Sequence, residues 1–508
     1  MEERIPAVAM RDITKRFGPV VANDKCWLNI YRGEILALLG ENGSGKTTLM
    51  NMLSGVYFPD EGTISIDGKE VVIRSPKDAF DLGIGMIHQH FKLVDVLTAA
   101  QNIVLGLPGK LNLKAASDKI REICDTYGFH VDPSQKIYDM SVSQKQTVEI
   151  VKVLYRGADI LILDEPTAVL TPQETEKLFA VLRNMRDAGK AIVIITHKLH
   201  EVEELSDRVA VLRRGQFTGD MLTKNTNARE MTNMMVGRPV VLNIERPLPV
   251  NPHPRITVEG LTVVDHEGTV KLDDVSFTAY SGEILGIAGV SGCGQKELLE
   301  SIAGLQKVQR GSIRYVEDNG SAEELIGKDP LSIQRMGVAL SFVPEDRLGM
   351  GLVGNMDLTN NMMLRSFRMG HSFFTDRKSP EELAEHIVKD LEVRTPGIST
   401  PVRRLSGGNV QKVLVGREIA NAPTVLLTAY AVRGLDINSS YTIYDLVNRQ
   451  KKAGVAVIYV GEDLDVLLEL ADRILVLCGG KVSGIVDGRK TNKNEVGAMM
   501  TKLGGIGL

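Results

Sequence analysis

The sequence predicts an α/β protein made of two homologous domains. Three features support this prediction: segments that recur about half a chain apart, apolar strand-like runs that end in glycine-rich or acidic turns, and helical stretches between those runs. Near-continuous runs of Ile, Val and Leu, such as EILALLG, ADILILDEP and KAIVIITH, are typical of parallel strands covered on both faces. The stretch from about Leu97 to Lys152 is predicted to form a helical subdomain inserted into the first sheet domain.

The repeat has an offset that grows along the chain. RGEIL at Arg32 recurs as SGEIL at Ser281, an offset of 249 residues, whereas SDRVAVL at Ser206 recurs as ADRILVL at Ala471, an offset of 265. The second copy therefore has about 16 extra residues. We expect a first domain at 1–238, a stiff Pro-rich linker at 239–254 and a second domain at 255–508.

Composition excludes several classes of protein. Of the 508 residues, 43% are hydrophobic and 24% charged, and the net charge of −4 disfavours a nucleic-acid partner. The four cysteines form no CxxC or Cys/His cluster, so disulfide scaffolding and zinc are not expected. The charged N-terminus lacks a signal-peptide core, and no run of about 20 apolar residues occurs, so we expect membrane contact only through a partner.

The first copy contains a phosphate-binding loop. GENGSGKT, at Gly40 to Thr47, fits GxxxxGK[ST] and lies between a predicted strand and a predicted helix. Its glycines let backbone N–H groups point at phosphate oxygens, and the following helix, with Thr48 in its first turn, adds its positive end. Lys46 is expected to hold the β- and γ-phosphates and Thr47 to place its hydroxyl on Mg²⁺. The predicted contact set is Gly40, Glu41, Asn42, Gly43, Ser44, Gly45, Lys46, Thr47 and Thr48.

Polar residues follow two further strands of the first copy. Asp164 and Glu165 end the run LILDE, and His197 ends the run IVIITH. An acidic pair can simply cap a strand, but beside a phosphate loop we expect Asp164 to bind Mg²⁺ and Glu165 to polarise the attacking water. His197 is a candidate γ-phosphate contact, although a lone histidine is more often structural. Phe17, placed in a loop ahead of the sheet, is a candidate to stack on adenine or a core residue.

These motifs together resemble the ABC ATPase family. Walker A is GENGSGKT, Walker B is LILDE, and LSGGN at Leu405 to Asn409 matches the family's signature motif. The resemblance makes Gln89 the Q-loop glutamine, a nucleotide and metal contact, and His197 the switch histidine. It implies tandem nucleotide-binding domains, each with a RecA-like P-loop core and a helical subdomain, that bind ATP and Mg²⁺.

More narrowly, the chain resembles the fused double-cassette ATPases of bacterial nucleoside and simple-sugar importers. IHQHF at Ile87 and the stretch LTAAQNIVLG favour the nucleoside branch, with simple sugars as the alternative cargo. The resemblance implies two transmembrane permease subunits, an extracytoplasmic binding protein or lipoprotein as an indirect partner, and a peripheral position on the cytoplasmic face of the membrane. We expect the surface from Phe91 to Asn102 to receive a permease helix.

The second copy has lost the groups that the chemistry needs. It keeps glycines at Gly289, Gly292 and Gly294, but the residues that correspond to the chemical groups of the first copy are Gln295, Lys296, Ala429, Tyr430, Glu462 and Glu345. Missing electrostatic groups raise reaction barriers steeply, so this copy is not expected to hydrolyse ATP.

The intact parts are divided between the copies in a consistent way. ABC cassettes pair head to tail, so the first phosphate loop is expected to face Ser406, Gly407, Gly408 and Asn409 of the second copy. The other signature, MSVSQ at Met140, has lost both glycines, and Ser143 departs from the importer pattern. The division therefore predicts one working ATP site, with Glu165 and His197 catalytic.

Three other classes of protein were weighed against this one. A soluble tandem ABC protein acting on ribosomes usually has two consensus sites and a charged helical linker. A DNA-repair ATPase needs zinc modules or coiled-coil insertions, and a non-catalytic regulatory subunit would not need Asp164, Glu165 and His197. None of these patterns fits the sequence.

Overall fold

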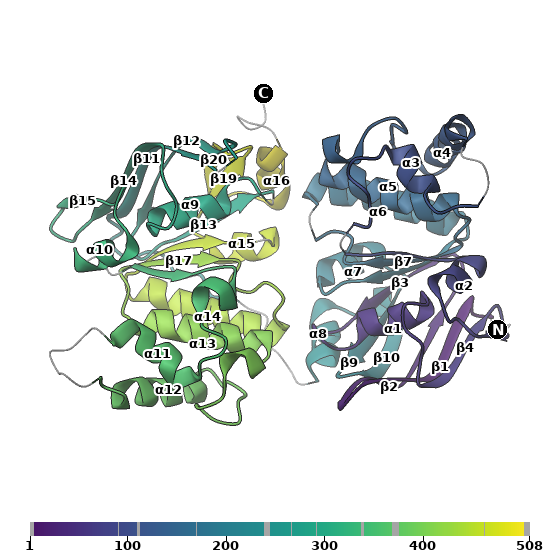
Figure 1. Cartoon of the computed structure of the whole chain (residues 1–508), viewed down its shortest axis with the longest axis horizontal. Helices are drawn as coiled ribbons and strands as arrows, with labels where there is room; N and C mark the ends of the chain where they lie inside the picture. The colour runs from purple at the N-terminus through teal and green to yellow at the C-terminus, as the bar shows by residue number, and fades with distance from the viewer. Residues whose placement is uncertain are drawn as a thin grey trace. The chain divides into compact units, whose positions relative to one another are not determined.

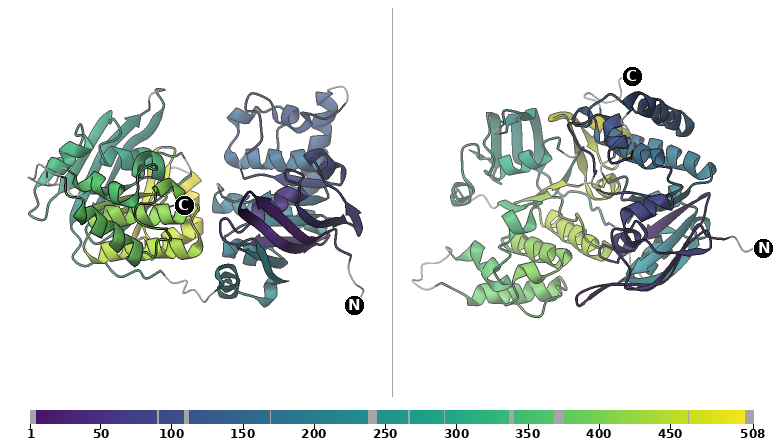
Figure 2. Two further views of the ribbon diagram at one scale, coloured as in Figure 1. Left: turned by 60° about the horizontal axis from the view of Figure 1, so that its bottom comes forward. Right: turned by 45° about the vertical axis from the view of Figure 1, so that its right-hand side comes forward.

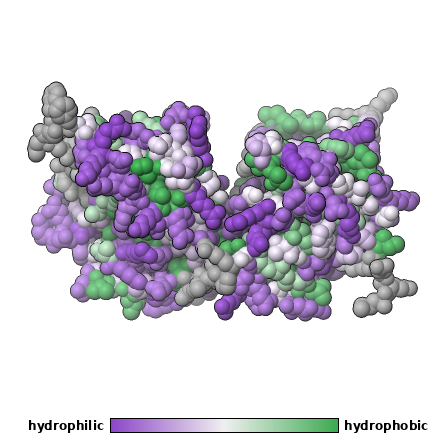
Figure 3. Space-filling model, turned by 90° about the horizontal axis from the view of Figure 1, so that it is seen from below, coloured by the Kyte–Doolittle hydropathy of each residue, from purple (hydrophilic) through white to green (hydrophobic). Residues whose placement is uncertain are grey.

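The computed structural model describes residues 5–89, 91–108, 112–168, 170–237, 244–265, 267–290, 292–336, 340–367, 375–461 and 463–501. It divides into two compact units (Figure 1), which we call unit 1, Met1–Val241, and unit 2, Leu242–Leu508. Within the described ranges no helix is both long and apolar enough to cross a bilayer. The face drawn in Figure 3 is mainly hydrophilic with scattered apolar patches.

Unit 1 is built on a six-stranded sheet with the order β10-β9-β3-β8-β7-β6. Neighbouring strands pair in parallel except β10, which runs antiparallel to β9. The strands are β3 (Glu34–Leu39), β6 (Ile84–Ile87), β7 (Ile160–Asp164), β8 (Ala191–Ile195), β9 (Arg208–Arg213) and β10 (Gln216–Leu222). The expected strands EILALLG, ADILILDEP and KAIVIITH are thus confirmed as β3, β7 and β8.

The helices of unit 1 cover both faces of this sheet. They are α1 (Lys46–Leu53), α2 (Pro76–Asp81), α3 (Ala99–Val104), α4 (Leu113–Tyr127), α5 (Val142–Tyr155), α6 (Pro172–Asp187), α7 (Leu199–Leu205) and α8 (Ala228–Val236), with short 3-10 turns at Ile137–Asp139 and Thr223–Asn225. The inserted helical subdomain is confirmed as α3 to α5.

A second sheet in unit 1 was not anticipated from the sequence. It has four antiparallel strands in the order β2-β1-β4-β5: β1 (Val8–Phe17), β2 (Val20–Ile30), β4 (Glu61–Ile66) and β5 (Lys69–Val71). The prediction that Phe17 lies in a loop is wrong, because Phe17 is the last residue of β1 and pairs with Val20 of β2. Strands β1 and β2 meet in a short turn, so Phe17 sits beside that turn.

Two hydrophobic clusters explain why the parallel strands are apolar along their whole length. Leu36 and Leu38 of β3 pack toward β1, β2, β4 and α1, whereas Ile35 packs with α3 to α6 on the other face. Successive side chains of a strand point to opposite faces, so a strand covered on both faces buries every residue. The three layers of unit 1 can be followed in Figure 2.

Unit 2 repeats this architecture. Its six-stranded sheet has the order β16-β17-β18-β13-β19-β20 and its four-stranded sheet the order β12-β11-β14-β15. The strands are β11 (Pro254–Val264), β12 (Val270–Tyr280), β13 (Ile284–Gly289), β14 (Arg310–Val316), β15 (Ala322–Glu324), β16 (Leu340–Val343), β17 (Val425–Ala429), β18 (Ala456–Val460), β19 (Arg473–Cys478) and β20 (Lys481–Asp487). The helices are α9 (Gln295–Ile302), α10 (Pro330–Arg335), α11 (Leu358–Ser366), α12 (Lys378–Asp390), α13 (Gly407–Ala420), α14 (Ile437–Lys452), α15 (Leu464–Leu470) and α16 (Lys493–Thr501), with short turns at Arg347–Gly351 and Val402–Arg404.

Strand register fixes how the two copies correspond. Ile84 of β6 pairs with Ile160 of β7, and Leu340 of β16 pairs with Val425 of β17. Because Ile160 and Val425 are 265 residues apart, Ile84 corresponds to Leu340 at an offset of 256. The same offset matches Gln89 to Glu345, as the sequence analysis supposed. The extra residues of the second copy are therefore inserted in two places, before and after this strand.

Candidate functional site

The phosphate loop of unit 1 connects β3 to α1 and depends on glycine. Gly45 has a φ of 94°, in the left-handed region that favours glycine. A Cβ atom at Gly45 would lie 2.4 Å from the carbonyl oxygen of Ala22 and 2.7 Å from Nδ2 of Asn23. A side chain at this position would push the loop away from β2.

Lys46 is turned into its own loop. Its Nζ donates to the carbonyl oxygens of Gly40 at 2.7 Å and Glu41 at 3.0 Å, and only 6% of the residue is exposed. Burial lowers the pKa of Lys46, while Glu165, Asp164 and Glu41 act in the opposite direction. The hydroxyl of Ser44 is buried without a hydrogen-bond partner in the described part of the chain. A buried ammonium and an unsatisfied donor at a helix start fit a bound phosphate.

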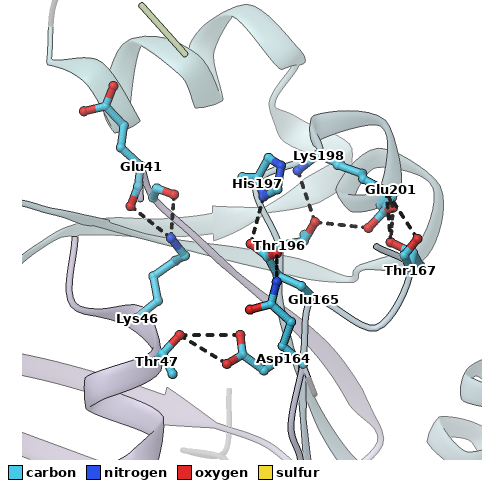
Figure 4. Close-up of polar contacts among 12 residues, drawn as sticks. Glu41, Lys46, Thr47, Asp164, Glu165, Thr167, Thr196, His197, Lys198 and Glu201 are labelled. Atoms are coloured by element: carbon cyan, nitrogen blue, oxygen red, sulfur yellow. Dashed lines mark hydrogen bonds and ion pairs between the residues drawn. The ribbon is translucent and has the colours of Figure 1, made fainter. Parts of the chain in front are cut away.

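Thr47 and Asp164 bring oxygen atoms together from α1 and β7. The Thr47 Oγ1 donates to Asp164 Oδ2 at 3.2 Å (Figure 4). Burial raises the pKa of Asp164, although the Thr47 hydrogen bond opposes this. Hydroxyl and carboxylate oxygens are the ligands that Mg²⁺ prefers. The described residues contain no group of three or more His, Cys, Asp or Glu able to hold a metal, so an ion here would need further ligands such as phosphate oxygens.

Glu165 lies between Gln89, which the family resemblance singled out, and His197, which was selected from its place at a strand end. Its Oε1 is 2.9 Å from Nδ1 of His197, and its Oε2 accepts from Nε2 of Gln89 at 3.0 Å. Burial acts to raise the pKa of Glu165, but the hydrogen bond from His197 and the charges of His197, Lys46 and Lys198 together outweigh it, and the pKa is lowered. Three strand ends, those of β6, β7 and β8, thus converge on one ionised carboxylate.

The turn that presents Glu165 is unusual for a residue with a side chain. Glu165 has a φ of 47°, and its N–H donates to the Ile195 carbonyl of β8 at 2.9 Å. A non-glycine residue in the left-handed region costs roughly 1–2 kcal/mol. Such strain is typical of functional sites, where the surrounding contacts hold the backbone.

A buried carboxylate behind this turn was missed by the sequence analysis. Glu201, in the first turn of α7, is 4% exposed. Its Oε2 accepts from Thr196 Oγ1 at 3.0 Å, and its Oε1 accepts from Thr167 Oγ1 and lies 3.2 Å from Nζ of Lys198. Figure 4 shows that these partners come from the loops after β7 and β8. Glu201 stands among other acidic residues in HEVEEL, and within this copy nothing marks it as the buried one.

Phe17 lies apart from this group of contacts. Its ring packs edge to face against Tyr57, with centroids 5.2 Å apart, and 42% of the residue is exposed. An exposed aromatic face at the end of β1 is compatible with stacking on a base.

The corresponding positions of unit 2 have different chemistry on a similar backbone. Gln295 is 2% exposed and donates to the Val290 carbonyl at 3.0 Å, and Lys296 points outward to Glu300 at 3.8 Å. Tyr430 has a φ of 52°, and its backbone N–H donates to the Val460 carbonyl at 3.0 Å, just as the backbone N–H of Glu165 donates to the Ile195 carbonyl. Glu345 is paired with Arg433. Glu462 lies outside the described residues.

The two signature segments begin their helices differently. In α5, the Ser141 hydroxyl accepts a hydrogen bond from the Gln144 N–H at 3.2 Å, and the Gln144 side-chain oxygen accepts one from the Ser141 N–H at 2.8 Å. In α13, Ser406 makes no side-chain cap; its hydroxyl accepts from Nδ2 of Asn409 at 2.9 Å instead. Gly407 at the start of α13 is exposed. The first N–H groups of α13 are therefore left without a side-chain acceptor from Ser406.

The family model described as "ABC transporter" matches the chain twice, at residues 24–168 and 272–428. The chain belongs to the ABC transporter family. Both matches begin ahead of a phosphate loop; the first runs past Asp164 and the second ends at residue 428, within β17. The two units are therefore its two cassettes. This family binds ATP, and the expectation of a tandem ABC ATPase fold is confirmed.

Two relatives match this ABC transporter family member over almost its whole length. A nucleoside import ATP-binding protein of Lactococcus lactis is 41% identical over 97% of this chain and 97% of its own. A glucose import ATP-binding protein of Haloferax volcanii is 39% identical over 98% of this chain and 96% of its own. Among solved structures, an archaeal ribosome recycling factor, aABCE1, bound to stalk protein aP1 has a TM-score of 0.59 at 17% identity, covering 92% of this chain and 87% of that one. At such low identity that likeness concerns the fold alone.

Proposed function

We propose that the chain is the ATP-hydrolysing subunit of an ABC importer for nucleosides or simple sugars, with a single competent catalytic half in unit 1. The near full-length relatives that import nucleosides and glucose support this proposal. Nucleosides are the first proposed cargo and simple sugars the second, because the nucleoside import relative is 41% identical and the glucose import relative 39%. We propose domain boundaries at 1–238 and 255–508, joined by the segment 239–254.

In the proposed site, the loop from Gly40 to Thr48 holds the triphosphate and Lys46 exchanges its carbonyl partners for phosphate oxygens. Phe17 stacks on the adenine. Thr47, Asp164 and Gln89 would hold Mg²⁺, a hard cation that takes oxygen ligands and spreads the negative charge of the phosphates. The 3.2 Å approach of Thr47 to Asp164 supports this assignment.

The observation that carries the catalytic proposal is the contact of Glu165 with both His197 and Gln89. A carboxylate with a lowered pKa remains ionised and accepts a hydrogen bond from the attacking water. His197 would orient that carboxylate, through the 2.9 Å contact of its Nδ1 with Glu165 Oε1, and would contact the γ-phosphate. In unit 2 the same position is Tyr430, which has no carboxylate for this role.

We further propose that the signature of unit 2 completes the site. Ser406, Gly407, Gly408 and Asn409 would contact the γ-phosphate held by unit 1, in the head-to-tail arrangement implied by the family. The uncapped start of α13 supports this, because free helix N–H groups attract anions. Ser141 is already engaged in capping α5.

The partners are proposed to be two transmembrane permease subunits, with an extracytoplasmic binding protein or lipoprotein acting indirectly. The chain would then sit on the cytoplasmic face of the membrane. The segment from Phe91 to Asn102 is the proposed docking surface in unit 1, supported by the exposure of Val94 (41%) and Val96 (69%). In unit 2 the segment after Glu345 lines a cavity of about 490 Å³, with Leu348, Val353 and Leu364 among its walls. ATP-driven closure and opening would bias the permeases between two states.

The test is a pair of substitutions at corresponding positions. Glu165→Gln is expected to abolish ATP turnover, a loss of about 10³-fold, while ATP binding persists, because Lys46 and its loop are unchanged. Tyr430→Phe is expected to leave turnover within about twofold. Turnover by the full-length chain and binding of a fluorescent ATP analogue are measured in parallel. Equal losses at both positions would contradict the single-site proposal.

A further inference from the structure

The buried carboxylate of Glu201 joins the two loops that carry the proposed catalytic pair. Thr167 lies two residues after Glu165, and Thr196 immediately precedes His197. Glu201 accepts hydrogen bonds from both threonine hydroxyls, the second at 3.0 Å, and pairs with Lys198 at 3.2 Å. One side chain thus fixes a residue on each side of the Glu165–His197 contact.

Charge burial makes this arrangement informative. A carboxylate that is 4% exposed is unfavourable unless its oxygens are fully compensated. Here the compensation comes from two hydroxyls and an ammonium in two loops. The Lys198 N–H also donates to Thr196 Oγ1 at 3.1 Å, so Thr196 is held from two directions. The loops are therefore restrained relative to each other by polar contacts as well as by the sheet.

The contacts of Glu201 with Thr167, Thr196 and Lys198 form a network, which we call the Glu201 network. Unit 2 shows that the fold does not require this network. The residues that correspond to Thr167, Thr196 and Glu201 are Val432, Gly461 and Val466. Val432 and Val466 both pack against the hydrophobic core of unit 2. The turn after the strand is nevertheless the same: Tyr430 is left-handed, and its backbone N–H donates to the Val460 carbonyl at 3.0 Å.

The network is thus present where Glu165 and His197 are present and absent where Tyr430 replaces the carboxylate. Because unit 2 folds without these contacts of Glu201, and unit 1 has them beside Glu165 and His197, they indicate a role in ATP hydrolysis and not in folding. We propose that Glu201 is a positioning residue that sets the distance between Glu165 and His197 during ATP hydrolysis. The proposal rests on the function assigned to unit 1 above.

Substitution of Glu201 should affect turnover and not nucleotide binding. In Glu201→Gln, the amide has one accepting oxygen and no negative charge. One threonine hydroxyl can then no longer donate to residue 201, and the ion pair with Lys198 is lost. We expect kcat for ATP to fall by about 10- to 100-fold, since small misplacements of catalytic groups have effects of this size. The KM for ATP should stay within about twofold, because Lys46 and Thr47 are untouched.

Glu204→Gln is the matched control. Glu204 lies on the same helix, α7, but is exposed and pairs with Arg183 at 3.7 Å on the surface. The same chemical change there should leave kcat and KM within about twofold of the wild type. A kcat for Glu201→Gln above half of the wild-type value would overturn the proposal.

A triple variant separates positioning from folding. Thr167→Val, Thr196→Gly and Glu201→Val together give these three positions the residues of unit 2 and leave no stranded hydroxyl or carboxylate. Lys198 keeps the carbonyl oxygen of residue 167 as an acceptor. We expect its melting temperature to stay within about 5 °C of the wild type while kcat remains as low as in Glu201→Gln. Recovery of kcat would mean that only stranded polar groups harm the single variant, and a large loss of stability would mean that the network is a folding requirement. Either result would overturn the proposal.

Glu165→Gln serves as the reference in the same series. If Glu165→Gln retains activity, the proposed function itself fails. If Glu165→Gln is inactive and Glu201→Gln is not, only the role of Glu201 is lost.

Discussion

Units 1 and 2 share a backbone but not a chemistry. In both, strand β7 or β17 is followed by a left-handed residue, Glu165 or Tyr430, whose backbone N–H donates to the neighbouring strand. Both keep a positive φ at the end of the phosphate loop, at Gly45 and Gly294. Among the residues that the structure describes, only those of unit 1 place an ammonium, a hydroxyl, two carboxylates and an imidazole around that backbone. The comparison teaches that the scaffold of this fold persists when the reacting side chains are gone.

The largest expected effect tests the phosphate loops against each other. Lys46→Ala removes the buried ammonium that reaches the loop carbonyls and, we propose, the phosphates. ATP turnover should fall by about 10²- to 10³-fold, comparable to the loss of one preorganised electrostatic group. The converse change, Gln295→Lys, should leave turnover within about twofold, because Ala429 and Tyr430 still lack carboxylates. A clear rise in turnover with Gln295→Lys would show that unit 2 is closer to competence than proposed.

A middle-sized effect concerns an ion pair that both units have kept. Glu34 accepts from Arg208 at 2.7 Å in unit 1, and Glu283 accepts from Arg473 at the same position of unit 2. Glu34→Gln should reduce the free energy of unfolding by about 2 kcal/mol, because it weakens a buried charge-assisted hydrogen bond. Glu283→Gln should cost less, since the Arg473 side chain is 30% exposed against 10% for Arg208.

Denaturant unfolding can resolve the two units in that experiment. The single tryptophan of the chain, Trp27, lies in unit 1, and its ring packs at a tilt against Phe217, so its fluorescence reports on unit 1. Circular dichroism follows both units. A shift of the tryptophan midpoint by Glu283→Gln as large as that by Glu34→Gln would mean that the units unfold together.

The smallest effect concerns the starts of the signature helices. Ser141→Ala removes a side-chain cap from α5 and should cost about 1 kcal/mol of stability with ATP turnover unchanged. Ser406→Ala removes no such cap and should barely change stability, but it should slow turnover if Ser406 contacts the γ-phosphate. Thermal unfolding and steady-state ATP hydrolysis of both variants are compared. The opposite pattern would argue against a role for the second signature.

The sequence predicted the parts of the molecule that have strong local patterns. The buried strands β3, β7 and β8 appear as apolar runs, and the phosphate loop appears as GENGSGKT. The four-stranded sheet was missed because β1 and β2 mix exposed charges with register shifts, which blurs their alternation. Phe17 was therefore placed in a loop.

The candidate site was predictable to the same extent. Glu165 and His197 were selected from their strand ends and Gln89 from the family resemblance, and the structure brings them into contact. Glu201 was not found because burial of one glutamate among several in HEVEEL depends on tertiary packing. Comparison of the two copies could have identified it, because the position of Glu201 in the first copy corresponds to Val466 in the second.

The left-handed turn at Tyr430 has a practical consequence for engineering. Building a catalytic centre from nothing usually requires a new loop conformation, which is difficult to design. In unit 2 the strained main chain is already formed, so restoring a second reaction centre would need only exchanges of side chains, beginning with Ala429→Asp and Tyr430→Glu. If unit 2 is inactive as proposed, it is a suitable scaffold for adding a reaction centre, with the corresponding residues of unit 1 as the template.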